Sequence, residues 1–384
     1  MKKLYVYPRS SQEWAFPLCP EPPQWPLNWQ GIQERFSWIQ ALAKVPQDEI
    51  FHAEGDVLTH TRMVTAALAE LSPWRDLSPE ERSLLFASAL LHDVGKSSCT
   101  KRDENGQIHS RGHARVGERW TRQMFWHEGV PFTSREYVAR LVRFHGLPLQ
   151  FLDKPSPERA VFEASQSVRM EHLALLAEAD VRGRICSDQQ ELLVRVELFR
   201  EFCQELECYE QPRQFASAHS RFVYFHSERG DPNYAAYDDT RFEVVLMVGV
   251  PGVGKDTWVR KHPGGLPMIS LDEIRKELKV APDENQGKVV QLARERAREL
   301  LRQQTPFVWN ATNIMRLRRQ ELVNMVVAYG GRVRIVYLDA PFEEIMQRNR
   351  QRQDCVPDKV INDFMYRMEV PDLTEAQVVE WVAV

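Results

Sequence analysis

The sequence lacks several features that would place it in a specialised class of protein. Its six cysteines, among 384 residues, form no Cys-x-x-Cys pair, so neither a zinc ribbon nor a disulfide framework is expected. The longest apolar runs, near 84–91 and 244–250, are far shorter than the roughly 20 residues of a membrane-spanning helix. The first residues contain no apolar core of a secretory signal peptide. We therefore expect a cytoplasmic protein with reduced thiols and no membrane association.

Charge is distributed unevenly along the chain. The net charge of −4 excludes a uniformly basic nucleic-acid coat protein but not a local basic groove. Residues 241–384 contain 22 Lys and Arg against 20 Asp and Glu, whereas residues 1–240 are acidic and hold ten of the eleven histidines. An acidic, histidine-rich part suits cation binding, and an arginine-rich part suits phosphate binding.

The hydrophobic pattern changes near residue 230 and predicts two domains of different fold. From about 32 to 225, apolar residues recur at spacings of three and four, which predicts helices. Residues 1–45 are poorly assigned, apart from a short strand expected at 4–7. From residue 242 onward, strands alternate with helices, which predicts a doubly wound α/β domain. We place the domains at 1–230 and 241–384, with a polar linker at 231–240.

A glycine-rich loop follows the first predicted strand of the second domain. Its nucleotide-binding candidates are Gly249, Gly252, Gly254, Lys255, Asp256 and Thr257. The glycines let backbone N–H groups surround phosphate oxygens, and Lys255 reaches the terminal phosphates of a nucleoside triphosphate. The residue after the lysine is usually Ser or Thr, which binds Mg²⁺, but here it is Asp256. A carboxylate can hold Mg²⁺ directly or through water; alternatively, Thr257 serves the metal and Asp256 is a charge at a helix N-terminus.

Two pairs of residues in the same domain suit phosphoryl transfer. Asp272 follows a predicted strand, where ligands bind in open α/β sheets, and can accept a proton from an attacking hydroxyl. Arg275, one helical turn later, can bind a phosphate of the acceptor. Arg348 and Arg352 are predicted to share a helical face before a Val-Pro step, like a lid that neutralises the transferred phosphoryl group. For each pair, a helix cap or a solvated helix surface is the plainer alternative.

Together, these motifs resemble the P-loop 5′-OH polynucleotide kinases over residues 241–370. In that family the loop reads GxxGxGK[ST], a DxxR motif carries the general base and an acceptor-phosphate arginine, and an RxxxR lid precedes Val-Pro. The resemblance implies these roles for Asp272, Arg275 and the lid arginines, with ATP or another NTP and Mg²⁺. The sequence departs from the family at Asp256 and at Asn310, where related kinases often have Asp after a strand. Small-molecule P-loop kinases share the loop and lid, so the DxxR motif carries most of the specificity.

Histidines and aspartates recur in the first domain at intervals of about one helical hairpin. The set consists of His60, His92, Asp93, His113, His145 and Asp180. The spacing is 32 residues from His60 to His92 and from His113 to His145, and 35 from His145 to Asp180. Since each lies at an end or on the inner face of a predicted helix, the set can surround one or two ions of Mn²⁺, Co²⁺, Ni²⁺ or Zn²⁺.

The order H…HD…H…H…D resembles the HD-domain phosphohydrolases over about 50–185. The four-ligand core of that family maps onto His60, His92, Asp93 and Asp180, and the resemblance implies that His113 and His145 hold a second metal. Lys96, in the segment HDVGK, matches the family's phosphate-contacting lysine. His52 is a candidate for supporting a metal ligand and Arg111 for binding a substrate phosphate, whereas His172 suits a core role.

The two halves together resemble bacterial HD-domain/polynucleotide kinase fusions that heal RNA ends. The resemblance implies an HD domain that removes a 2′-phosphate or 2′,3′-cyclic phosphate and a kinase that phosphorylates a 5′-OH end of RNA or DNA. A separate nucleic-acid ligase would then act, because the sequence has no KxDG-type lysine. The alternatives are a nucleotide phosphohydrolase fused to a small-metabolite kinase, and an end-binding sensor with decayed sites.

Overall fold

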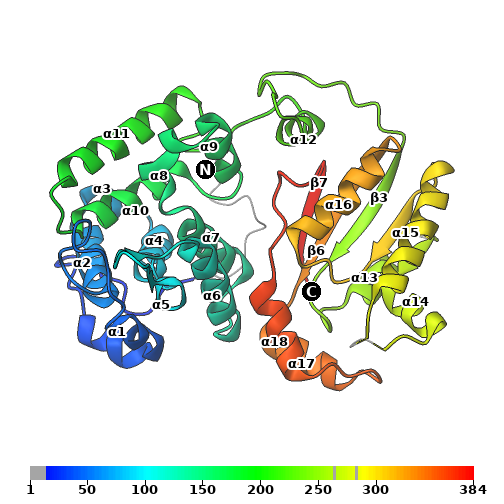
Figure 1. Cartoon of the computed structure of the whole chain (residues 1–384), viewed down its shortest axis with the longest axis horizontal. Helices are drawn as coiled ribbons and strands as arrows, with labels where there is room; N and C mark the ends of the chain where they lie inside the picture. Colours follow the sequence, from blue (N-terminus) through cyan, green and yellow to red (C-terminus); the bar gives the residue numbers. More distant parts are fainter. Residues whose placement is uncertain (1–13, 263–264, 282–283) are drawn as a thin grey trace. The chain divides into compact units, whose positions relative to one another are not determined.

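The chain divides into two compact units, residues 1–214 and 215–384 (Figure 1). This computed structural model describes residues 14–262, 265–281 and 284–384. The short strand expected at 4–7 therefore lies outside the described residues. Helix α12 (Ala218–His226) belongs to the second unit, whereas the linker was expected at 231–240. The domain bounds at 1–230 and 241–384 stay a prediction.

Unit 1, residues 1–214, is built from helices, and the predicted helical class is confirmed. Its helices are α1 (Trp29–Arg35), η1 (Ser37–Leu42), α2 (Val57–Glu70), α3 (Ser72–Arg75), α4 (Pro79–Leu91), α5 (Lys96–Cys99), α6 (His113–His127), α7 (Phe132–Phe144), α8 (Leu147–Gln150), η2 (Phe151–Asp153), α9 (Pro157–Ser165), α10 (Met170–Arg182) and α11 (Gln189–Glu205). Helices α2, α4, α7 and α10 form its centre, where they pack against one another (Figure 1).

Helix α4 is the central helix of unit 1. It begins with a capping box, in which the Ser78 hydroxyl accepts from the backbone of Glu81 and the Glu81 carboxylate accepts from the backbone of Ser78. Residues 84–91 are buried on every side of the helix, which is typical of a helix inside a core. The apolar run therefore carries the next two residues, His92 and Asp93, into the interior.

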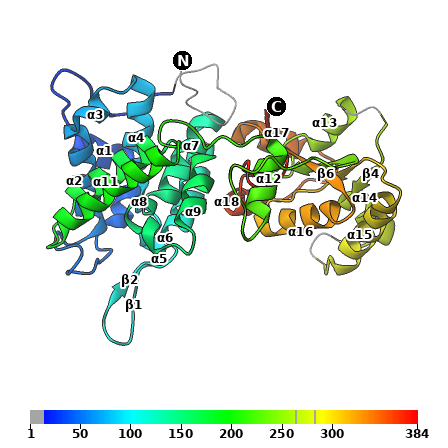
Figure 2. The ribbon, with the colours of Figure 1, turned by 90° about the horizontal axis from the view of Figure 1, so that it is seen from above.

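A small hairpin interrupts the helices of unit 1. Strands β1 (Lys101–Arg102) and β2 (Ile108–His109) pair antiparallel and project from the unit (Figure 2). The Asp103 carboxylate accepts from the backbone of Asn105 and Gln107, both at 2.9 Å, and holds the turn. No strand is predicted here from the sequence, because strands of two residues are too short to establish an alternating pattern.

Unit 2, residues 215–384, contains a five-stranded parallel sheet, and the predicted α/β class is confirmed. Its strands are β3 (Phe242–Val248), β4 (Met268–Ser270), β5 (Phe307–Asn310), β6 (Gly331–Asp339) and β7 (Val378–Ala383), in the spatial order β4-β5-β3-β6-β7. Its other helices are α13 (Lys255–Lys261), α14 (Leu271–Leu278), α15 (Gly287–Arg302), α16 (Arg316–Val327), α17 (Phe342–Arg350) and α18 (Asp358–Arg367). Strands β4 and β5 lie on one side of β3, and strands β6 and β7 lie on the other. The strand order therefore reverses at β3, and ligands bind at the carboxyl end of such a switch point in α/β sheets.

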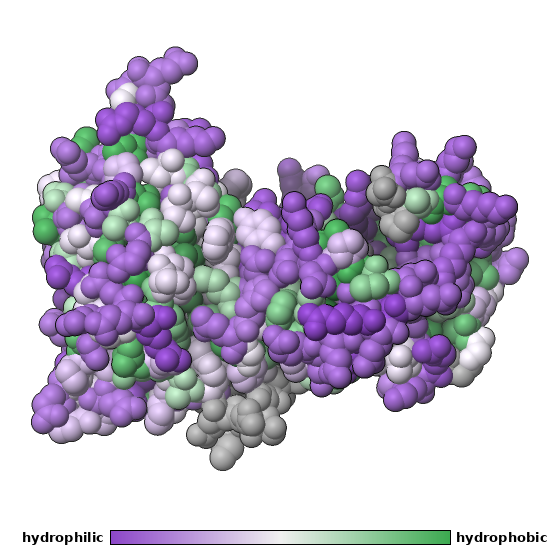
Figure 3. Space-filling model, turned by 90° about the horizontal axis from the view of Figure 1, so that it is seen from below, coloured by the Kyte–Doolittle hydropathy of each residue, from purple (hydrophilic) through white to green (hydrophobic). Residues whose placement is uncertain are grey.

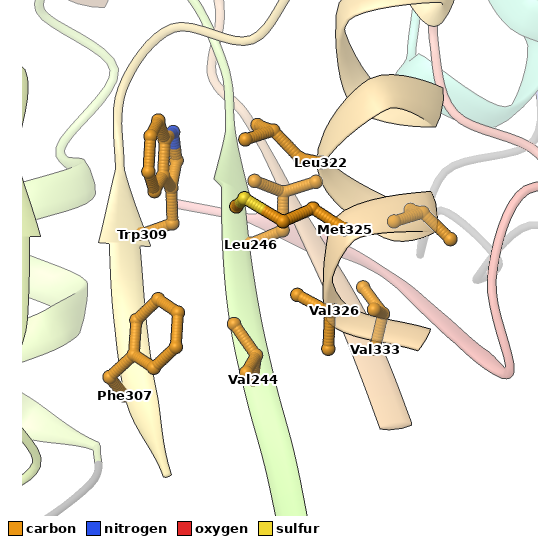
Figure 4. A pocket seen from close by; sticks show the side chains of 9 residues that line it. Val244, Leu246, Phe307, Trp309, Leu322, Met325, Val326 and Val333 are labelled. Atoms are coloured by element: carbon orange, nitrogen blue, oxygen red, sulfur yellow. The ribbon is translucent and has the colours of Figure 1, made fainter. Parts of the chain in front are cut away.

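Helix α16 covers part of one face of the sheet. Figure 4 shows its side chains Leu322, Met325 and Val326 facing the sheet residues Val244, Leu246, Phe307, Trp309 and Val333. The small cleft between them is lined by apolar side chains and includes no residue of the glycine-rich loop. We therefore assign this cleft to the core of unit 2 rather than to a ligand site.

The described residues include exposed apolar side chains from many parts of the chain. On the face shown in Figure 3, hydrophilic residues predominate and hydrophobic ones form small, separate groups. Exposed apolar side chains such as Ile50, Ile185 and Leu317 come from distant parts of the sequence. Among the described residues, no helix has the length and apolar character needed to cross a membrane.

Candidate functional site

Six side chains in unit 1 converge around Asp93. His60 lies in the first turn of α2, His92 and Asp93 follow α4, His113 opens α6, His145 follows α7, and Asp180 lies in the last turn of α10. All are buried except His113, which is half-buried. Residues separated by up to 120 positions therefore meet where helices begin or end.

The Asp93 carboxylate lies between two groups of histidines. Its Oδ2 is 3.2 Å from His92 Nε2 and 3.8 Å from His60 Nε2. Its Oδ1 is 3.4 Å from His113 Nε2 and 3.9 Å from His145 Nε2. Oδ1 is buried and makes no hydrogen bond within the part of the chain that the structure describes. We call the group of His60, His92, Asp93 and Asp180 the first half-site, and Asp93, His113 and His145 the second half-site.

Backbone contacts fix the orientation of three of the imidazoles. The Nδ1 atoms of His92, His113 and His145 lie 2.8 Å from the carbonyl oxygens of Ala89, Ser110 and Val142, respectively. Since a carbonyl only accepts, each Nδ1 carries a proton, and each Nε2 is turned inward. The Nε2 atoms approach within 3.3 Å both between His60 and His92 and between His113 and His145. Facing lone pairs repel unless a cation or proton lies between them.

The charges of the site act differently on its histidines. Burial disfavours the charged form of His60, but the carboxylates of Asp180 and Glu54 outweigh this effect and raise the pKa of His60. Burial and the neighbouring charges of His113 and His92 lower the pKa of His145 to about 3. Burial alone would raise the pKa of Asp93 and of Asp180. Lys96 and Arg184 respectively oppose this effect and hold both pKa values well below the usual range. Neutral imidazoles and ionised carboxylates are the donors that transition metals bind, so the residues fit one or two such ions.

Lys96 lies at the edge of the cluster of side chains around Asp93. Its ammonium is 2.8 Å from Asp93 Oδ2 and donates to Gln47 Oε1 at 2.8 Å. The expected role in phosphate binding stays a prediction. It requires the ammonium to exchange at least one of these contacts for a substrate oxygen.

Gly95 allows the start of α6 to approach the cluster. A Cβ at this position would lie 2.2 Å from the carbonyl oxygen of His113 and 2.6 Å from the backbone nitrogen of Gly117. No side chain fits in that space, so glycine is required for His113 to reach Asp93.

The glycine-rich loop of unit 2 connects β3 to α13. Gly249, Gly252 and Gly254 have φ values of 152°, 83° and 106°, which side chains rarely adopt. Lys255 folds over the loop and donates to the carbonyls of Gly249 at 2.9 Å and Val250 at 3.0 Å. Burial lowers the pKa of Lys255 to about 8, although nearby carboxylates oppose the effect.

Asp272 and Arg275 form an ion pair at the start of α14. Asp272 is exposed, and Arg275 also donates through Nε to Gln286 Oε1 at 2.7 Å. Asp272 is among the carboxylates that act electrostatically on Lys255, so α14 begins near the loop. The roles of base and acceptor-phosphate ligand stay predictions.

Arg348 contacts the glycine-rich loop from α17. It donates to the carbonyl of Val253 at 3.2 Å and pairs with Glu344 at 2.6 Å. Its side chain therefore already lies against the segment expected to surround phosphate.

Arg352 does not share a helical face with Arg348, contrary to expectation. Helix α17 ends at Arg350, and Arg352 follows it in a turn. The buried Asn349 side chain explains the end, because it donates to the carbonyl of Val356 at 2.7 Å and accepts from its backbone N–H at 3.0 Å. The chain therefore folds back instead of continuing as a helix. Arg352 remains close enough to Lys255 to act on its pKa.

Family comparisons divide the chain in the same way as the structure. Residues 57–170 match the family model of the HD domain, and residues 244–371 match that of an AAA domain. The chain thus combines a region that matches the HD domain with one that matches an AAA domain. The resemblance to an HD-domain/kinase fusion is thereby confirmed at the level of its two domains.

Solved structures resemble only part of the chain. A candidate kinase of Chloroflexus aurantiacus J-10-fl is 14% identical over 38% of this chain and 86% of its own, with a TM-score of 0.32. A chain of the Pnkp1/Rnl/Hen1 complex is 19% identical over 32% of this chain and 47% of its own, with a TM-score of 0.26. The tunicamycin resistance protein of Deinococcus radiodurans is 20% identical over 33% of this chain and 80% of its own, with a TM-score of 0.26.

Two supporting residues of the HD domain were not expected from the sequence. Glu54 Oε1 lies 2.8 Å from His60 Nδ1 and 2.9 Å from His52 Nδ1, and its side chain is fully buried. Arg184 holds Asp180 with its NH2 group 2.6 Å from Oδ2. Glu54 thus lies beside Nδ1 of His60, as a backbone carbonyl lies beside Nδ1 of each of the other three histidines. Its only sequence signal was an acidic residue shortly before a metal-binding helix.

The remaining histidine and arginine candidates of the HD domain lie elsewhere. His52 is in the loop before α2, where its Nδ1 lies 2.9 Å from Glu54 Oε1 and its ring packs edge-on against that of His60, with 4.9 Å between the ring centroids. His172 is buried in α10, where its Nδ1 lies 2.8 Å from the Tyr137 hydroxyl, which fits the expected core role. Arg111 is exposed just before α6.

Proposed function

We propose that this protein is a bifunctional enzyme that heals nucleic-acid ends. The HD domain would hydrolyse a 2′-phosphate or 2′,3′-cyclic phosphate, and the AAA domain would transfer the γ-phosphate of an NTP to a 5′-OH end. The observation that carries the proposal is that one chain holds two complete sets of residues for phosphate chemistry. One is the six-ligand cluster around Asp93, and the other is the glycine-rich loop with Asp272 and Arg275.

In the HD domain, the first half-site would bind one divalent ion and the second half-site another. Bound ions of this kind polarise a phosphoryl oxygen and lower the pKa of water. Asp93 would contribute a carboxylate oxygen to each half-site, because its two oxygens face different histidine pairs. Lys96 would bind a phosphate oxygen at the edge of the cluster.

In the AAA domain, Lys255 would contact the terminal phosphates and Asp272 would accept the proton of the attacking 5′-hydroxyl. Arg275 would bind the phosphate that follows this hydroxyl in a polynucleotide. Because Asp272 and Arg275 are paired in this structure, an acceptor phosphate would compete with Asp272 for the guanidinium and leave the carboxylate free. A phosphate-bearing acceptor would therefore both bind more tightly and release the base.

Arg348 and Arg352 would stabilise the charge that develops on the transferred phosphoryl group. Arg348 is already in contact with the loop, and Arg352 lies in the turn after α17. A turn can reorient more readily than a helix, so Arg352 is the better candidate for a contact made only during reaction.

The direct test uses an RNA with a 5′-OH and a 2′,3′-cyclic phosphate, incubated with ATP, Mg²⁺ and Mn²⁺. Both ends should change, to a 5′-phosphate and a 3′-OH. Asp93→Ala should abolish only the 3′ reaction and Lys255→Ala only the 5′ reaction. If neither end changes and a nucleoside or small metabolite is phosphorylated instead, the end-healing proposal is wrong. The same assay with matched DNA compares the two polymers.

The products would have partners of a defined kind. A 5′-phosphate and a 3′-OH are the ends that a nucleic-acid ligase joins, so a separate ligase would act after this protein. Such a reaction sequence would suit the cytoplasm, where free thiols persist.

A further inference from the structure

Asp256 and Asn310 interact directly at the carboxyl edge of the sheet. Asp256 is in the first turn of α13, and its Oδ1 accepts from Asn310 Nδ2 at 2.6 Å. Asn310 is the last residue of β5, which pairs with β3, the strand that leads into the glycine-rich loop. Two residues separated by 54 positions are therefore held together beside the nucleotide-binding loop.

These two positions have defined roles in P-loop nucleotide-binding proteins. There, Mg²⁺ is held by the Ser or Thr after the loop lysine and by an Asp at the end of a neighbouring strand. In this chain the first position is Asp256 and the second is Asn310. The carboxylate is thus present at the position after the loop lysine, and the neutral amide is at the end of the strand.

The surroundings of the pair fit a hard cation. Asn310 is buried, and its Oδ1 makes no hydrogen bond to any residue that the structure describes. An unpaired buried oxygen next to a carboxylate is the type of donor that Mg²⁺ prefers. Asp256 and the alternative ligand, Thr257, are both exposed, but only Asp256 contacts Asn310, whereas the Thr257 hydroxyl accepts from Arg260 at 3.4 Å.

We propose that Asp256 supplies the protein carboxylate for the nucleotide-bound divalent ion and that Asn310 orients it and contributes its own Oδ1. The two ligand types have exchanged positions between loop and strand. This inference rests on the nucleotide-binding part of the proposed function and is independent of the acceptor. A carboxylate so close to the loop repels the phosphates of a metal-free nucleotide, so the pair makes nucleotide binding depend on the metal.

The test measures binding rather than turnover. The dissociation constant of a fluorescent, non-hydrolysable ATP analogue is determined with Mg²⁺ and with EDTA for the full-length protein. The variants are Asp256→Asn, Asp256→Thr combined with Asn310→Asp, and Thr257→Val, which removes the rival metal ligand. Mn²⁺ replaces Mg²⁺ in a parallel measurement of bound metal by electron paramagnetic resonance. Circular dichroism verifies that each variant is folded.

In Asp256→Asn, the gain in affinity on adding Mg²⁺ should fall at least tenfold, the lower end of the roughly 10- to 100-fold effects seen when metal sites lose support. Binding in EDTA should be unchanged or tighter, since a negative charge is gone. The double variant should recover metal dependence, because it restores the usual arrangement of ligands. Thr257→Val should resemble the wild type.

The inference is overturned if Asp256→Asn keeps the full effect of Mg²⁺, or if Thr257→Val loses it. A double variant no better than Asp256→Asn would also contradict the exchange of positions. The outcome is separate from that of the end-healing test. A protein that fails to phosphorylate 5′-OH ends can still bind Mg²⁺ and nucleotide through Asp256, and an active kinase can do so through Thr257.

Discussion

The close approach at Gly95 makes a specific prediction about the metal sites. Gly95→Ala would place a Cβ 2.2 Å from the carbonyl oxygen of His113. Because favourable contacts of carbon lie at about 3.5–4.0 Å, the first turn of α6 must retreat by roughly 1 Å. His113 Nε2 is now 3.4 Å from Asp93 Oδ1, and metal geometries tolerate displacements of only about 0.5 Å. The second half-site should therefore lose its ion while the first half-site keeps one.

The same substitution should also lower stability. Overpacking of this kind costs about 1–3 kcal/mol, so the melting temperature should fall by several degrees. The backbone of Gly95 has ordinary helical angles, φ −68° and ψ −17°, so the effect is steric and not conformational. Mn²⁺ stoichiometry by calorimetry and thermal unfolding provide the two measurements.

Gly146→Ala is the matched control. Gly146 follows the ligand His145 and has φ −80°, and the nearest atom to an added Cβ is 3.9 Å away in the Gln150 side chain. This variant should bind the same number of ions as the wild type and melt at the same temperature or higher. The steric reasoning is refuted if Gly95→Ala retains wild-type stoichiometry and affinity, or if Gly146→Ala loses an ion as readily.

Three further predictions concern single side chains. Glu54→Gln should weaken metal binding at the first half-site about 10- to 100-fold in competition with a chelator, because it removes the carboxylate beside His60 Nδ1. Substitution of the exposed Glu49 by Gln should leave metal affinity unchanged. Equal effects of the two substitutions would contradict the role of Glu54. Lys255 has a pKa of about 8 without nucleotide, and bound phosphates favour its charged form. Nucleotide binding at pH 9 should therefore take up nearly one proton and weaken as pH rises, whereas at pH 7 it should take up almost none. Calorimetry in buffers of different ionisation enthalpy measures this proton uptake, and Lys255→Arg should abolish the uptake. If the heat of binding at pH 9 does not depend on the buffer, Lys255 does not take up a proton and the prediction is wrong. Arg275→Ala should raise KM roughly 10- to 100-fold for a 5′-OH dinucleotide bearing a 3′-phosphate, the equivalent of about 1.5–3 kcal/mol for a charge-assisted contact. It should not change KM for the bare nucleoside, and equal wild-type activity on both acceptors would favour a small-metabolite kinase.

The convergence of the side chains around Asp93 could be predicted from the sequence, because these residues follow the geometry of helical hairpins. Histidines 32 residues apart return to the same end of neighbouring helices, so their convergence follows from helix lengths and loops. The supporting residues have no such regularity. Glu54 comes from a loop and meets His60 only because Gly55 and Asp56 turn the chain into α2. Which side chains touch the outer faces of the ligands depends on tertiary packing, which spacing does not encode.

The α/β unit was predictable where its elements are long and less so at its edges. The run at β3 and the glycine spacing after it identify the loop and the switch point of the sheet. Strand β7 at 378–383 was not expected, since it lies at the sheet edge and its residues are only partly buried. The end of α17 also escaped prediction, because Asn349 ends it through a contact with Val356 rather than through a glycine or proline.

The contact between Asp93 and Lys96 predicts a coupling between metal binding and phosphate binding in the HD domain. Asp93 Oδ2 lies 2.8 Å from the Lys96 ammonium, and Asp180 Oδ2 lies 2.6 Å from the guanidinium of Arg184. A divalent ion would attract the same carboxylate oxygens more strongly than a single ammonium does, so its binding would weaken the contact between Asp93 and Lys96. The ammonium would then be available to a phosphate oxygen of the substrate. Since coupling between two ligands is reciprocal, a phosphate bound to Lys96 would also leave Asp93 free for the metal, and we expect each ligand to favour binding of the other.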